Sequence, residues 1–238
     1  MKHVIHFCWF GGTQKPAIVE RCFESWKRFC PDWEIIEWNE SNFDINVVPY
    51  VREAYLHKKW AFVSDYCRFY VLYNYGGVYL DADVELLRSL DGLPDSFVGF
   101  EKTTYVNSGL IRAANVGDPL CLQMMQLYEN DHFVNADGSL NMTSVCVRET
   151  ELLKKHGLVC NNKLQKIDGI TVFPNSWFSP KNFFANRLEI SENTYSIHHF
   201  MASWLPFRSW LGIMMYRLIY ILFGERFADW LVSLIVKH

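Results

Sequence analysis

The stretch KWAFVSDYCRFYVLYNYGGVYLDADVEL, from Lys59 to Leu86, decides how this chain of 238 residues is organised. It predicts a helix over about 58–73, two glycines that end this helix, and a short apolar strand over 78–80. Asp81 and Asp83 follow the strand, with one residue between them. Residues two apart on an extended backbone point to the same side, so the two carboxylates are expected to lie together. Because two such charges repel each other unless a cation lies between them, the pattern predicts a divalent-metal site.

The predicted helix carries a charged pair within an apolar stripe. Ala61, Asp65, Arg68 and Leu72 are spaced by four, three and four residues, so they share one face of the helix. One interpretation is an internal ion pair that serves only the packing of the helix. The other is a pair of charges directed into a polar pocket at the edge of the sheet. The spacing alone leaves both interpretations open.

The flanking residues predict an α/β fold. Strands over 4–10 and 33–38, joined by a helix between Pro16 and Pro31, favour a parallel sheet. In open α/β sheets ligands bind outside the carboxyl ends of the strands, where Asp81 and Asp83 would lie. Further along the chain, strands are expected over 84–87, 96–100, 107–112, 170–173 and 195–200, and helices over 50–56, 118–128 and 142–156.

Composition excludes some classes of protein. Half of the residues are hydrophobic, which excludes a disordered chain, and a net charge of −3 argues against a nucleic-acid partner. The seven cysteines are odd in number and include no CxxC pair, so reduced thiols in a cytosolic protein are expected. We expect no signal peptide and no conventional membrane span.

The composition changes at Leu205. Residues 205–238 are mainly apolar and predict a helical hairpin, with helices over 210–223 and 227–236. This tail either packs on a protein surface or lies in a membrane interface as an anchor. Arg208, Arg217 and Arg226 favour the membrane interface, whereas Glu225 weakens it. We expect a catalytic domain over 1–204 and a membrane-associating tail over 205–238.

A metal site needs a ligand from elsewhere in the chain. His198 and His199 end a predicted strand, and an imidazole beside carboxylates fits Mn²⁺ better than Mg²⁺. The alternative is ordinary packing of two histidines in a strand. Ser203 and Trp204 follow closely and can donate hydrogen bonds to phosphate oxygens. Trp9 ends the first strand, where it belongs either to the core or to a surface that stacks on a nucleobase.

Five segments in chain order resemble one family. They are similar to the DXD-motif sugar-transferase family, which includes retaining GT-A transferases of capsule and lipopolysaccharide synthesis and initiating α-mannosyltransferases. A more distant likeness is to the glucosyltransferase domain of large glucosylating toxins. The resemblance covers about residues 1–204 and implies an α/β, Rossmann-like GT-A fold that binds a nucleotide-sugar with Mn²⁺ or Mg²⁺. The segments are HFCWFGG (6–12), SWKRFCPDWEIIEWNESNFD (25–44), WAFVSDYCRFYVLYNYGGVYLDADV (60–84), NSGLI (107–111) and SIHHFMASW (196–204).

The resemblance also implies roles for single residues. Asp65 and Arg68 match the pair that holds the donor sugar, Asp81 the first acid of the DXD motif, and Asp83 the direct metal ligand. His199 begins the element that supplies a late metal ligand, although His198 remains an alternative, and Ala202 stands where the family commonly has glycine. The remaining matches are Trp9 to the residue that stacks on the base, Tyr79 and Asn107 to the donor pocket, and Ser203 and Trp204 to phosphate contacts.

These observations predict a retaining glycosyltransferase, peripheral on the cytosolic face of a membrane. It would move one sugar from a UDP- or GDP-sugar to a glycan or lipid-linked oligosaccharide of a capsule or lipopolysaccharide. Two other functions stay open. The segment LDADV (80–84) also resembles the opening motif of aspartate-nucleophile phosphatases. A non-catalytic, membrane-associated factor of polysaccharide assembly is the other.

Overall fold

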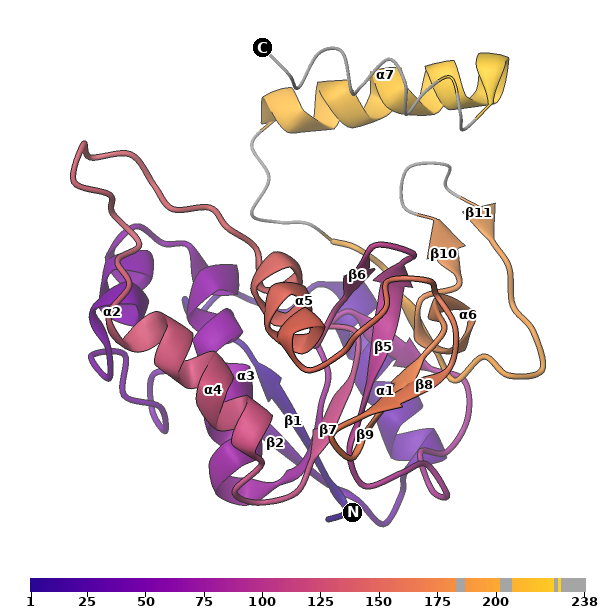
Figure 1. Cartoon of the computed structure of the whole chain (residues 1–238), viewed down its shortest axis with the longest axis horizontal. Coiled ribbons are helices and arrows are strands. Elements are labelled where there is room, and N and C mark those ends of the chain that lie inside the picture. The colour runs from indigo at the N-terminus through magenta and orange to yellow at the C-terminus, as the bar shows by residue number, and fades with distance from the viewer. Residues whose placement is uncertain (183–186, 202–206, 225–226, 228–238) are drawn as a thin grey trace.

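A mixed sheet forms the centre of the chain. The structure, a computed structural model, describes residues 1–182, 187–201, 207–224 and 227. The main sheet has the strand order β2-β1-β3-β7-β5-β9-β8, and β6 pairs with β5 beside this path. The pairs β1–β2, β1–β3 and β5–β9 are parallel, whereas β7 and β8 run antiparallel to their neighbours. The predicted α/β fold with a mostly parallel sheet is therefore confirmed (Figure 1).

The elements alternate as the sequence predicts for such a sheet. The helices of the main body are α1 (Ala17–Phe29), α2 (Pro49–Leu56), α3 (Trp60–Tyr75), α4 (Pro119–Glu129), α5 (Val145–Lys155) and α6 (Asn175–Phe178). The strands are β1 (Val4–Cys8), β2 (Glu34–Trp38), β3 (Gly77–Tyr79), β4 (Val84–Leu86), β5 (Phe97–Lys102), β6 (Tyr105–Val106), β7 (Arg112–Ala114), β8 (Gln165–Ile167), β9 (Ile170–Phe173), β10 (Lys181–Asn182), β11 (Arg187–Leu188) and β12 (Ser196–His198).

Helices bury both faces of the main sheet. The core that lies with α2, α3, α4 and α5 contains Phe69, Leu72 and Tyr128. The core on α1 contains Trp26 and Phe97. Because both faces are covered, β1 and β9 are buried at every residue, and their sequences are apolar runs rather than alternating patterns. All seven cysteines are free, as expected.

The backbone around the two acids differs from the prediction. Asp81 and Asp83 do not lie on one extended strand, because the chain leaves the main sheet after β3 and turns. Val84 donates its backbone N–H to the carbonyl oxygen of Asp81 at 3.0 Å, which closes this turn. β4 then pairs with β12 in a separate two-stranded sheet. The turn, rather than strand alternation, brings the two carboxylates together.

A second expected strand is also a turn. Residues 107–111 connect β6 to β7, and of the predicted strand over 107–112 only Arg112 lies in a paired strand, β7. Leu110 donates its backbone N–H to the carbonyl oxygen of Asn107 at 3.2 Å. The prediction failed because the apolar residues Leu110 and Ile111 are buried in a turn against the core, and burial alone does not distinguish a turn from a strand.

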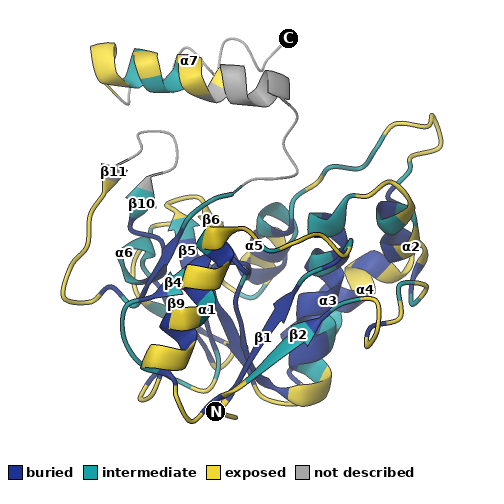
Figure 2. Cartoon of the chain, turned by 180° about the vertical axis from the view of Figure 1, so that it is seen from behind, coloured by how far each residue is buried: buried dark blue, intermediate teal, exposed yellow. Residues whose placement is uncertain are grey.

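The tail begins with α7 (Phe207–Phe223), which lies apart from the sheet in both views of the chain (Figures 1 and 2). Several large apolar side chains on α7 are exposed, among them Met214, Leu218 and Ile221. Within the described residues, no helix is both long and apolar enough to cross a membrane. Of the predicted second helix over 227–236, only Phe227 lies inside the described residues.

Candidate active site

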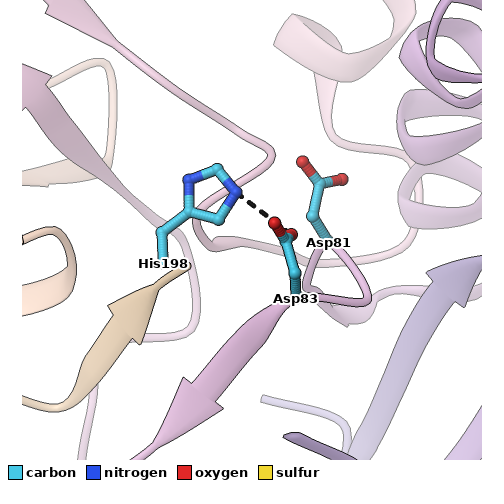
Figure 3. Close-up of side chains that lie close together, drawn as sticks. All are labelled: Asp81, Asp83 and His198. Carbon is cyan, nitrogen blue, oxygen red and sulfur yellow. Dashed lines mark hydrogen bonds and ion pairs between the residues drawn. The ribbon is translucent and has the colours of Figure 1, made fainter. Parts of the chain in front are cut away.

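Three side chains meet beyond the end of β3. Asp81, Asp83 and His198 each offer one ligand atom, and these atoms lie within 4.8 Å of one another (Figure 3). The acids come from the turn between β3 and β4, and the histidine comes from the end of β12. Because β4 and β12 pair antiparallel, with His198 opposite Val84, residues more than one hundred positions apart become neighbours. We call these three side chains the acid–histidine cluster.

Hydrogen bonds fix Asp83 within this cluster. Nε2 of His198 lies 3.1 Å from Oδ1 of Asp83, and the backbone N–H of Met201 donates to Oδ2 at 2.8 Å. Burial alone would raise the pKa of Asp83, but the charge and hydrogen bond of His198 outweigh it and lower this pKa to about 2. Burial lowers the pKa of His198, and the charges of Asp83, Asp81 and Glu101 raise it by more.

The two neighbouring histidines have different surroundings. The His199 ring lies away from the cluster, with Nε2 2.8 Å from Glu85 and 3.2 Å from Arg21. Its backbone N–H donates to the carbonyl oxygen of Asp83 at 3.0 Å. The structure therefore places His198, and not His199, beside the two acids. The sequence left the choice between the two rings open, and the structure separates them because consecutive residues of a strand point to opposite sides.

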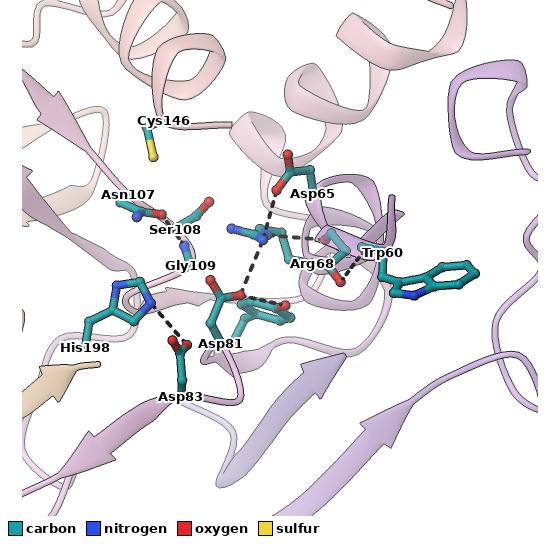
Figure 4. Close-up of polar contacts among 12 residues, drawn as sticks. Trp60, Asp65, Arg68, Asp81, Asp83, Asn107, Ser108, Gly109, Cys146 and His198 are labelled. Carbon is teal, nitrogen blue, oxygen red and sulfur yellow. Dashed lines mark hydrogen bonds and ion pairs between the residues drawn. The ribbon is translucent and has the colours of Figure 1, made fainter. Parts of the chain in front are cut away.

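A second set of charges borders the cluster. Nη2 of Arg68 lies 3.0 Å from Asp65 and 3.4 Å from Asp81, and Tyr79 donates its hydroxyl hydrogen to Asp81 at 3.1 Å (Figure 4). Arg68 is only 3% exposed, and its Nη1 has no hydrogen-bond partner among the described residues. The pair on α3 is therefore more than an internal ion pair, because one buried donor is left for a further acceptor.

Burial shifts the titration of this pair. The pKa of Asp65 is raised to about 6 because burial outweighs the opposing effects of Arg68, Arg148 and the backbone N–H of Val145. Burial lowers the pKa of Arg68, but Asp81 and its other negative neighbours raise it well above the ordinary value. One guanidinium cannot neutralise two carboxylates, so Arg68 stays charged while Asp65 titrates at higher pH than usual.

The turn over 107–111 presses against both sets of charges. Gly109 accepts the backbone N–H of Asp81 at 2.8 Å, and Asn107 Oδ1 accepts the backbone N–H of Gly109 at 2.7 Å. A Cβ atom added to Gly109 would lie 2.3 Å from Asp81 Oδ2 and 2.8 Å from Arg68 Nη1. Only glycine permits this approach, and the interpretation of residues 107–112 as a strand did not include it although Ser-Gly pairs mark turns.

These residues line one cavity of about 960 Å³. Asp65, Arg68, Tyr79, Asn107 and the acid–histidine cluster all lie in its wall, as does Trp9. Nε1 of Trp9 donates to the carbonyl oxygen of Thr13 at 2.8 Å, and the Lys15 ammonium lies 5.7 Å from the centre of its ring. Trp9 is therefore a wall residue rather than a fully buried core residue. Ser203 and Trp204 lie outside the described residues.

The cavity also contains residues that sequence reasoning missed. Glu101 and Tyr105 line it from the β5–β6 hairpin, Trp60 from the start of α3, and Cys146 from α5. The aromatic ring of Trp60 approaches Gly11, where an added Cβ would lie 2.5 Å from the ring. Trp60 opens one of the segments that resemble the sugar-transferase family, whereas Glu101, Tyr105 and Cys146 belong to none of them. Tertiary packing creates the wall that these residues share.

The residues present fit a divalent cation. Two carboxylates and one imidazole form a donor set that Mn²⁺ accepts, and the carboxylates also suit Mg²⁺. Their ligand atoms already converge within 4.8 Å.

Comparisons with known proteins agree with this site. The family model "Glycosyltransferase sugar-binding region containing DXD motif" matches residues 16–99. The structure is similar to the PaToxG glycosyltransferase, with 17% identity, a TM-score of 0.53, and coverage of 65% of this chain and 69% of that one. A glycosyltransferase involved in glycosylation of the major capsid of PBCV-1 is 10% identical, with a TM-score of 0.36 over 73% of this chain and 83% of that one. No inference is based on that second, weaker likeness. The comparison with curated proteins gives no match.

Residues 16–99 are therefore similar to the sugar-binding region of DXD-motif glycosyltransferases, and this match supports a glycosyltransferase. The likeness to PaToxG supports the fold of this class. The phosphatase interpretation left Asp65 and Arg68 without a role, whereas in the structure Arg68 contacts both Asp65 and Asp81.

Proposed function

We propose that the chain transfers one sugar from a nucleoside-diphosphate sugar, with a divalent cation held by Asp81, Asp83 and His198. One observation carries the proposal. The acid–histidine cluster and Arg68, whose buried Nη1 has no hydrogen-bond partner among the described residues, line the same cavity. A nucleotide-sugar has a diphosphate that needs a cation and sugar hydroxyl groups that need buried hydrogen-bond partners, so it matches both halves of the site.

In this proposal different residues of the cavity bind different parts of the donor. Asp65 accepts hydrogen bonds from hydroxyl groups of the donor sugar, and Arg68 Nη1 donates one, while Tyr79 and Asn107 border the same pocket. Trp9 stacks on the nucleobase of the donor. The experiment below compares UDP- with GDP-sugars. When bound, Mn²⁺ or Mg²⁺ supplies the positive charge that stabilises a leaving diphosphate. Ser203 and Trp204 are proposed to donate to its phosphate oxygens.

The charge of Arg68 has a further use in this site. As the bond from the sugar to the diphosphate breaks, negative charge grows on the diphosphate and positive charge grows on the sugar ring. Arg68 lies between Asp65 and Asp81. Its guanidinium stabilises the negative charge on the diphosphate, while the two carboxylates stabilise the positive charge on the sugar ring. We propose that the new bond keeps the anomeric configuration of the donor. Proton NMR of the product tests this proposal, since an anomeric coupling constant that indicates the opposite configuration would contradict it.

Calorimetry tests the donor and the cation. Titration of UDP- and GDP-sugars in the presence of Mn²⁺ is expected to show binding by the parent chain, and much weaker binding by Asp83→Ala and His198→Ala. His199→Ala is the matched control, because its ring contacts Glu85 and Arg21 instead of the cluster. The proposal fails if no nucleotide-sugar binds, or if the His198 and His199 variants lose affinity equally.

We further propose that the acceptor is a glycan of a surface polysaccharide, carried on a lipid at the cytosolic face of a membrane. The exposed apolar side chains of α7, including Met214, Leu218 and Ile221, support this, because such a surface suits a lipid interface. Sedimentation with phosphatidylglycerol vesicles is expected for the parent and lost in the double variant Leu218→Glu, Ile221→Glu. The exposed Val159 and Leu164, changed to Glu together, form the control. Equal binding by all three proteins would contradict the proposal.

A further inference from the structure

One wall of the cavity has no part in binding the donor as proposed above. The β5–β6 hairpin contributes Glu101 and Tyr105 to this wall. The hairpin pairs Phe100 with Val106 and Lys102 with Tyr105, so Glu101 lies at an irregularity of the β-bulge type. Bulges redirect a side chain relative to the regular strand, and they are common next to active sites.

The Glu101 carboxylate is held in place by the turn that also contacts Asp81. Asn107 Oδ1 accepts the backbone N–H of Gly109, so its Nδ2 is left to donate, and it donates to Glu101 Oε2 at 2.6 Å. Gly109 in turn accepts the backbone N–H of Asp81 at 2.8 Å. A short chain of hydrogen bonds therefore sets the position of Glu101 relative to the acid–histidine cluster.

The remaining atoms of this wall match a sugar. The two hydrogen-bond partners of Glu101 among the described residues, Asn107 at 2.6 Å and the Cys146 thiol at 3.9 Å, both contact Oε2. Oε1 is thus available to accept a hydrogen bond from a hydroxyl group. Tyr105 is 39% exposed and lines the same cavity as Glu101, so its ring can offer an apolar face there. A carboxylate that accepts from hydroxyl groups, next to an exposed aromatic ring, is suited to bind a pyranose ring.

We propose that Glu101 and Tyr105 form the acceptor subsite and bind the sugar residue whose hydroxyl group receives the transferred sugar. The proposal rests on the function proposed above, because it leaves the donor to the residues named there. Glu101 accepts a hydrogen bond from an acceptor hydroxyl group and orients it, and the Tyr105 ring packs on the apolar face of the same sugar. Glu101 is not a ligand of the cation, since the ligand atoms that converge belong to Asp81, Asp83 and His198.

The experiment separates donor binding from transfer. The parent is given the nucleotide-sugar that binds in calorimetry, first alone and then with octyl β-glucoside, octyl β-galactoside or octyl β-mannoside as acceptor. For Glu101→Gln we expect donor affinity and donor hydrolysis close to those of the parent, with a KM for the octyl glycoside about 10-fold higher or more, the effect of one hydrogen bond to a charged group. Tyr105→Ala is expected to raise the same KM, and Tyr105→Phe to leave it unchanged.

Each other outcome has a defined meaning. Glu129→Gln, an exposed position on α4, is the control for loss of one negative charge. An unchanged acceptor KM in Glu101→Gln, or a matching loss of donor affinity, overturns the acceptor subsite while leaving the donor site intact. A parent that hydrolyses the donor but glycosylates none of the octyl glycosides also overturns it. If the parent binds no nucleotide-sugar, the proposed function itself fails, and the subsite fails with it.

Discussion

Two buried arginines in this chain have similar surroundings but different partners. Arg68 is 3% exposed and lies between Asp65 and Asp81, whereas Arg112 is 2% exposed and lies between Asp118 and Glu149. Arg112 also donates to Ser96, Phe97 and Ala113, and none of its nitrogens lacks a partner among the described residues. Arg68 has an Nη1 without a partner and lines the cavity.

The difference shows which observation marks a functional site. Burial and paired charge are common to both arginines, so neither feature distinguishes binding from packing. The Arg112 set is closed, since Asp118 caps α4 and Glu149 accepts the backbone N–H of Ser108 at 3.0 Å. By contrast, Asp65, Arg68 and Asp81 all line the cavity. An unpartnered buried donor that borders a cavity is what assigns a site to Arg68.

The largest effect on folding is expected at Arg112. Arg112→Met leaves Asp118 and Glu149 buried without their positive partner, which should lower the free energy of unfolding by about 3–5 kcal/mol. Urea denaturation measures this loss. The fraction that remains folded is expected to bind the nucleotide-sugar with parental affinity. A loss of affinity in the folded protein would break the distinction between the two arginines.

At Arg68 the larger effect is expected on turnover. Arg68→Lys keeps a positive charge but loses the planar guanidinium. The lysine side chain can therefore no longer donate to Asp65, Asp81 and the substrate at the same time. We expect the rate of sugar transfer to fall about 10²–10³-fold, as for removal of a donor that stabilises transition-state charge. Initial rates at saturating donor measure it. A rate within a few-fold of the parent would show that Arg68, like Arg112, serves the fold.

The ionised carboxylate of Asp65 is expected to lower the free energy of unfolding at neutral pH. Its pKa is raised from 3.8 to about 6 in the folded chain, so the folded state takes up the proton before the unfolded state does. The contribution of Asp65 to stability therefore increases as the pH falls from 6 towards 4, and its ionised form costs up to about 3 kcal/mol above pH 6.

The variant Asp65→Asn isolates this effect. It should be more stable than the parent at pH 7 and lose most of this advantage at pH 4, while binding the donor more weakly. Urea denaturation at the two pH values measures the difference. Lower stability at pH 7 would indicate that the ion pair with Arg68 is structural after all.

A smaller effect is expected at Gly109. Gly109→Ala places a methyl group against Asp81 and Arg68, and such overpacking typically lowers the free energy of unfolding by about 1–3 kcal/mol. The displacement of Asp81 should weaken Mn²⁺ binding without removal of any ligand atom. Gly212→Ala serves as control, because an added Cβ there meets nothing within 4 Å. Mn²⁺ affinities that agree between the two variants would contradict the close approach at Gly109.

Local patterns in the sequence were sufficient for the α/β class. The apolar run of β1, the helix between Pro16 and Pro31 and the two glycines after α3 each depend on neighbours in the chain, and each was predicted to within a few residues. The helix over 118–128 was also predicted, and Asp118 caps it as α4 by accepting from backbone N–H groups two and three residues later. The turns at Asp81–Asp83 and at 107–111 were not, since each depends on which strand the chain pairs with next.

The candidate site divides in the same way. The sequence by itself determined that two acids follow a buried strand and that Asp65 and Arg68 share a helical face, because these are relations between near neighbours. Only the tertiary structure decided that His198 rather than His199 joins the acids, since pairing of β12 with β4 sets which ring points inward. The tertiary structure also positioned Glu101, through a hydrogen bond to Asn107 that no spacing in the sequence predicts. Long-range contacts of this kind come from packing of the whole chain, and a local pattern contains no record of them.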